Sequence, residues 1–75
     1  MAHEILATLP GKVSQLNINV GDRVEADEEA LLIELMKMET PILIPCNGII
    51  KEVRVKAGDE VEENDILAVI ETVAA

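Results

Sequence analysis

Two short apolar runs in the middle of the chain are separated by only a few residues. The first covers residues 30–35 and the second covers residues 40–44. Apolar runs of this length with so short a connection are typical of two strands joined in a β-hairpin. The connection contains Lys37, flanked by Met36 and Met38. The pattern therefore predicts a hairpin with Lys37 at its tip, where the long side chain carries its amine into solvent.

Other strand-like segments lie on both sides of this hairpin, separated by turns. Residues 4–9 predict a first strand, which a Pro-Gly pair ends. Residues 13–20 predict the next strand, because Leu16, Ile18 and Val20 alternate with two asparagines. Each strand is expected to bury one face and to expose the other.

The second half of the chain repeats the first at a constant offset of 37 residues. The offset pairs Gly11 with Gly48, Gly21 with Gly58, Asp22 with Asp59, Val24 with Val61, Ile33 with Ile70, and Glu34 with Glu71. A unit this short cannot bury its apolar face alone, so two units should close on each other. We therefore predict an all-β fold, a flattened eight-stranded barrel or sandwich of two four-strand repeats with approximate two-fold symmetry.

The repeat gives Lys37 a distinctive position. The first unit ends at Leu35 and the second is expected to begin near Asn47, so Lys37 lies in the crossover between the units. Its counterpart at the same offset is Ala74, near the end of the chain. One lysine is thus expected to stand alone at a protruding turn, in the hairpin between strands 4 and 5.

Four residues predict local backbone geometry. Asp27 and Asn64 occupy matching turns, where a positive φ is expected because these residue types tolerate it. Pro41 and Pro45 have no N–H to donate to a ladder, so we expect them at a sheet edge or at a strand end.

The composition indicates one small domain, residues 1–75, stabilised by aliphatic packing. There is no aromatic residue, and 49% of the residues are hydrophobic. Cys46 is the one cysteine, so no disulfide can form within the chain, and His3 is the one histidine. One cysteine and one histidine are too few ligands for a zinc site, so we predict no metal site. The lone thiol and the absence of a secretory signal lead us to expect a cytoplasmic protein.

The formal net charge of −9 restricts the partners. It argues against binding a nucleic-acid backbone or an anionic membrane, because both carry the same sign of charge. It favours a soluble protein that docks transiently on basic partners and is monomeric by itself. No nucleophile and base stand in a recognisable catalytic pattern, so we do not expect an enzyme.

Residues 34–40 read Glu-Leu-Met-Lys-Met-Glu-Thr and resemble the biotin-attachment motif Glu-Ala-Met-Lys-Met-Glu-Thr, with Leu35 in the place of alanine. The turn glycines of both repeats fall where the biotinyl and lipoyl carrier domains have theirs. The resemblance covers nearly the whole chain, and this family folds as a flattened eight-stranded barrel with the modified lysine in a hairpin.

The resemblance implies a biotin carboxyl carrier domain. Biotin would be joined to Lys37 by a biotin protein ligase that reads Met36 and Met38. The attached biotin would carry carboxylate between the biotin carboxylase and carboxyltransferase sites of a biotin-dependent carboxylase such as an acyl-CoA carboxylase. The domain would be a non-catalytic carrier. Packing of both methionines against the barrel rim is an alternative to ligase recognition, and Glu34 and Glu39 are expected to be solvated charges.

Two other interpretations remain. The first is a lipoyl carrier domain of a 2-oxoacid dehydrogenase, a branch that favours Asp-Lys-Ala at the tip. The second is a purely structural barrel-sandwich module whose lysine stays unmodified.

Overall fold

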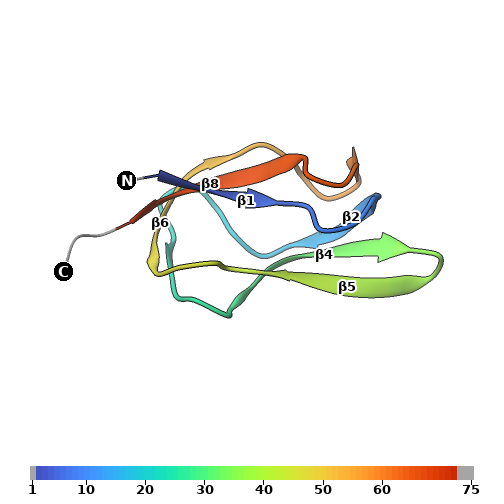
Figure 1. Ribbon diagram of the computed structural model, residues 1–75, viewed down its shortest axis with the longest axis horizontal. Coiled ribbons are helices and arrows are strands. Elements are labelled where there is room, and N and C mark those ends of the chain that lie inside the picture. Colours follow the sequence, from blue (N-terminus) through green and yellow to red (C-terminus); the bar gives the residue numbers. More distant parts are fainter. Residues whose placement is uncertain (1, 73–75) are drawn as a thin grey trace.

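The fold is all-β, and the computed structural model describes residues 2–72 (Figure 1). Its eight strands are β1 (Ala2–Leu6), β2 (Gly11–Leu16), β3 (Arg23–Val24), β4 (Glu29–Leu35), β5 (Met38–Leu43), β6 (Gly48–Val53), β7 (Glu60–Val61) and β8 (Ile66–Thr72). The molecule is elongated, with extents of 41 × 18 × 18 Å. In the part of the chain that the structure describes, no helix is long and apolar enough to cross a membrane.

The strands form two antiparallel four-stranded sheets, with the orders β1-β8-β6-β3 and β5-β4-β2-β7. Each sheet takes two strands from each half of the chain, so the halves interlock rather than stack as separate units. The sheets enclose an aliphatic core and no buried polar or charged residue is found among residues 2–72. The largest fully buried side chains are Leu31, Ile33, Ile44, Ile50, Leu67, Ile70 and Val13. These aliphatic contacts are the main source of stability in a chain that can form no internal disulfide.

The predicted repeat is confirmed in the strand register. The pairing of β2 with β4 matches that of β6 with β8 at the offset of 37 residues: Val13 faces Ile33, and Ile50 faces Ile70. Both ladders carry a bulge at the equivalent position. The pairing of β4 with β5 matches that of β1 with β8 in the same way. The two halves are therefore related in space as well as in sequence.

The turns follow the same symmetry. Asp27 and Asn64 have the predicted positive φ, at 72° and 74°. Gly21 and Gly58 have φ of 93° and 98°, where a side chain is strained. Pro41 lies on β5, which is an edge strand as expected. Sequence patterns of turn residues thus translate directly into the backbone.

Two sequence predictions are wrong. The second unit begins at Met38, because β5 is the equivalent of β1; it does not begin near Asn47. The strand expected over residues 13–20 ends at Leu16, and Val20 is 65% exposed. Ile18 is still buried, so the alternating pattern reports burial up to that residue and fails at Val20, where the chain turns. Ala74, the expected counterpart of Lys37, lies outside the described residues.

Candidate functional site

The candidate site is the hairpin between β4 and β5. The ladder extends to the pair Leu35 and Met38, so Met36 and Lys37 alone form the turn. Both have positive φ, 54° and 67°, which identifies a two-residue type I′ turn. The tip lies at the end of the long axis opposite to the start of β1 and the end of β8 (Figure 1). The predicted hairpin is therefore present, with Lys37 at its tip.

The turn is built from residues that do not favour it. Type I′ turns prefer asparagine and glycine, which tolerate a positive φ, whereas methionine and lysine each incur a steric penalty of about 1–2 kcal/mol there. The neighbouring ladder must hold this conformation. Such local strain is commonly found at functional sites.

The tip exposes apolar side chains around one amine. Met36 is 87% exposed and Met38 is 72% exposed. Both side chains are therefore largely open to solvent, with little packing against the rim. Lys37 is exposed, and within residues 2–72 its amine makes no ion pair or hydrogen bond. The two ion pairs between described residues are formed by Lys51 with Glu71 and by Arg54 with Glu52.

A row of charged residues crosses the exposed face of the sheet next to the tip. From one edge to the other the row contains Glu39, Glu34, Lys12 and Glu60. Glu34 and Glu39 face each other directly, an arrangement in which like charges repel. Both are exposed, as expected for solvated charges.

Ser14 takes part in this region although no sequence pattern identified it. Its hydroxyl donates to Oε2 of Glu39 over 2.8 Å, reaching from β2 across β4 to β5. Ser14 can do so because it is the unpaired residue of the bulge between Val13 and Gln15. The bulge itself was not predicted, although two exposed residues in a row between Val13 and Leu16 depart from strict alternation.

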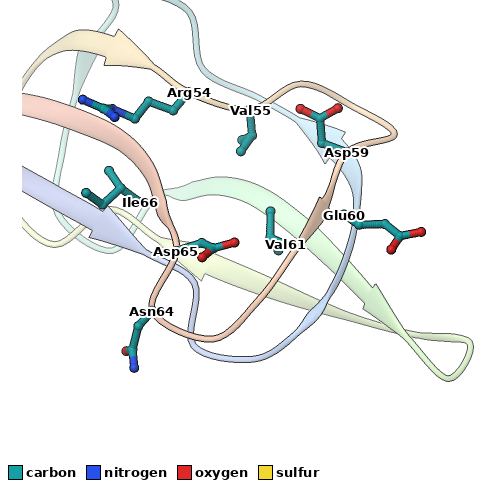
Figure 2. A pocket seen from close by; sticks show the side chains of 8 residues that line it. All are labelled: Arg54, Val55, Asp59, Glu60, Val61, Asn64, Asp65 and Ile66. Atoms are coloured by element: carbon teal, nitrogen blue, oxygen red, sulfur yellow. The ribbon is translucent and has the colours of Figure 1, made fainter.

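One hollow borders the tip and a second lies beside β7, and neither holds a catalytic constellation. One of about 390 Å³ is lined in part by Leu35, Met36 and Val61. A larger one of about 630 Å³ lies between the β6–β7 connection and the start of β8, and Figure 2 shows its lining side chains. Two of its carboxylates, those of Asp59 and Asp65, accept backbone N–H groups and so serve the turns. In the described part of the chain, no group of three His, Cys, Asp or Glu residues could hold a metal ion.

What this geometry can do chemically is display one nucleophilic amine. Acylation of such an amine needs access from outside and freedom from a competing ion pair, and Lys37 meets both requirements. Covalent attachment of a carboxylic acid group such as biotin therefore fits the residues present. The fold and the tip together define a small all-β attachment domain.

Comparison with known proteins identifies the family. The family model described as "biotin-requiring enzyme", which covers biotin and lipoyl attachment, matches residues 3–70. The chain belongs to this family. It is 41% identical over 59 residues to the biotin/lipoyl attachment protein of Bacillus subtilis, covering 79% of this chain and 81% of that protein.

Two larger proteins contain a similar segment. The pyruvate carboxylase of Staphylococcus aureus is 43% identical over 65 residues, which is 87% of this chain but only 6% of that enzyme. The crystal structure of the Kluyveromyces lactis urea carboxylase matches with a TM-score of 0.87 and 32% identity, covering 95% of this chain and 6% of that protein. This chain thus corresponds to one small segment of each of these carboxylases.

Proposed function

We propose that the protein is a biotin carboxyl carrier domain and that biotin is attached to Lys37. The observation that carries the proposal is the tip itself: a single unpaired amine on a strained two-residue turn, with exposed methionines on both sides. Membership of the family and the similarity to segments of two carboxylases support it. Met36 and Met38 are the side chains that a biotin protein ligase would contact, because they flank the amine and are open to a partner.

Attachment needs little from the domain beyond presentation of the amine. The nitrogen of Lys37 attacks the carboxyl carbon of biotin, which the ligase has activated with ATP. An amide bond forms, the activating group leaves with the electron pair of the broken C–O bond, and the nitrogen loses a proton. Acylation removes the charge of Lys37, so the tip afterwards presents a neutral, flexible arm among exposed methionines.

Biotin bound there supplies a ring that takes up carboxylate at one active site and releases it at another. The chain's own part is to present the arm at the extremity of a rigid body 41 Å long. A short flexible tether gives an effective concentration on the order of mM at a docked active site. The partners we propose are therefore a biotin carboxylase and a carboxyltransferase, with a domain that contributes no catalytic group of its own.

Lipoyl attachment is the second candidate, favoured by the name of the Bacillus subtilis relative, which includes both groups. Lys37 presents the same amine to either acid. The Met-Lys-Met tip resembles the biotin branch of the family rather than the lipoyl branch.

Co-expression followed by intact-mass measurement separates the two candidates. The chain is expressed with a biotin protein ligase in one culture and with a lipoate-attaching enzyme in the other. The proposal predicts one biotin adduct in the first culture and largely unmodified chain in the second. A lipoyl adduct without a biotin adduct would favour the second candidate. No adduct in either culture would contradict both candidates and favour a structural module whose lysine stays unmodified.

A further inference from the structure

We propose that Ser14 is a positioning residue that keeps the carboxylate of Glu39 away from the amine of Lys37. The side-chain hydroxyl of Ser14 donates to Oε2 of Glu39 over 2.8 Å. Its distance to the carbonyl oxygen of Leu32 is 3.4 Å, and a hydroxyl has one hydrogen, so the contact with Glu39 is the stronger bond. The biological meaning of this contact rests on the proposed function of Lys37.

The chain brings Glu39 close to Lys37. Glu39 follows Lys37 by two residues, so at about 3.3 Å per residue the two Cα atoms are within about 7 Å of each other. Both side chains are long and exposed. Glu34 faces Glu39 from β4, and repulsion between the two carboxylates favours any cation that Glu39 can reach. An unrestrained Glu39 would therefore be drawn towards Lys37.

The other half of the molecule has a cation at the position of Ser14. The residue equivalent to Ser14 is Lys51, which occupies the matching bulge on β6. Its amine pairs with Oε2 of Glu71 over 3.6 Å, and Glu71 is the equivalent of Glu34. A lysine at this bulge position thus pairs with the carboxylate on the neighbouring strand. In the half that contains the tip, serine replaces the cation and binds the carboxylate of Glu39 instead.

An ion pair at Lys37 would oppose acylation, because the nitrogen must release its partner and its proton before it attacks a carbonyl carbon. Exposed ion pairs contribute only about 0.2–1 kcal/mol, so release of Glu39 should slow acylation by roughly 1.4- to five-fold. The effect should disappear in about 1 M salt, where the screening length falls to about 3 Å.

The test measures the reactivity of each lysine in the unmodified 75-residue chain. A limiting amount of an acetyl N-hydroxysuccinimide ester is added at low ionic strength, and peptide mass spectrometry quantifies acetylation. The amine attacks the ester carbonyl, N-hydroxysuccinimide leaves, and the nitrogen loses a proton. Ser14→Ala should slow acetylation of Lys37 roughly 1.4- to five-fold relative to wild type, with the other lysines unchanged.

Three further variants distinguish positioning from a structural role. Ser14→Thr keeps the hydroxyl and should react like wild type. Adding Glu39→Gln to Ser14→Ala should restore the rate, because the released side chain no longer carries a charge. Gln15→Ala removes another exposed side-chain hydrogen bond on the same strand, the 2.8 Å bond to Asn17, and should change nothing at Lys37.

Several results would overturn the proposal. These are an unchanged rate in Ser14→Ala, a loss that Glu39→Gln does not restore, or an equal loss at all four lysines. The rate of biotin transfer by the ligase should follow the same order of variants. If wild-type chain accepts no biotin, the proposed function fails, while the ester experiment still decides the role of Ser14. If biotin is accepted but Ser14→Ala reacts like wild type in both assays, only the role of Ser14 fails.

Discussion

Replacing the tip by Asn-Gly should stabilise the domain and abolish attachment. Met36 and Lys37 have φ of 54° and 67°, and each incurs about 1–2 kcal/mol in this region. Asparagine recovers part of the penalty at the first position, and glycine recovers all of it at the second but loses about 0.5–1 kcal/mol in conformational entropy. Met36 is 87% exposed, so its removal exposes almost no further apolar surface. The net gain should be about 1 kcal/mol in the free energy of unfolding.

Differential scanning calorimetry is the suitable assay, because the chain has no Trp, Tyr or Phe to report unfolding by fluorescence. For a domain of this size a gain of about 1 kcal/mol should raise Tm by about 4–8 °C. Met36→Val is a control at one of the two turn positions: a β-branched residue tolerates positive φ least, so Tm should fall. An Asn-Gly variant that melts at or below the wild-type temperature would show that the tip is not strained.

The glycines of the repeat give two further predictions, and each can be tested at two equivalent positions, one in each half of the chain. Gly21→Val and Gly58→Val should each lower the free energy of unfolding by about 1–3 kcal/mol, because φ is 93° and 98° although nothing lies within 4 Å of the added Cβ. Gly11→Ala and Gly48→Ala should lower it by about 1–3 kcal/mol through a clash, since each Cβ would lie 2.5 Å from a backbone carbonyl oxygen. Urea denaturation followed by far-ultraviolet circular dichroism measures all four. A clear loss in one member of a pair and none in the other would contradict the equivalence of the halves.

The hairpin and the repeat could be predicted because local chemistry determines both. Two apolar runs with so short a connection leave few alternatives to a hairpin, and Gly21 and Gly58 identify equivalent turns without any knowledge of the fold. Asp27 and Asn64 were predictable for the same reason, since few residue types accept their φ. Such features depend on the residue types at a few positions, so they can be predicted without knowing how distant parts of the chain pack together.

The start of the second unit could not be predicted from the same signals. β1 and β5 are edge strands, each paired on one side only, so fewer of their residues are constrained. Ile5 and Leu6 recur as Ile42 and Leu43, but the three residues before them differ in type. The exchange of strands between the two sheets is likewise a property of long-range pairing. It leaves the apolar pattern of each strand unchanged.

The bond between Ser14 and Glu39 depends on a different kind of information. It requires the bulge in β2 and the adjacency of β2, β4 and β5, which are separated by up to 25 residues in the sequence. A serine in a strand has no distinctive pattern. The residue therefore becomes visible as a candidate only in three dimensions.

The identity of the modified residue is the central claim, and site-specific substitution with intact-mass measurement tests it most directly. Two variants are co-expressed with a biotin protein ligase: Lys37→Arg, and a triple variant in which Lys12, Lys51 and Lys56 are all replaced by arginine. We expect no adduct on the first and one biotin on the second, with both variants folded by calorimetry. Biotin on the Lys37→Arg variant, or a folded triple variant without biotin, would contradict the assignment of Lys37 as the attachment site.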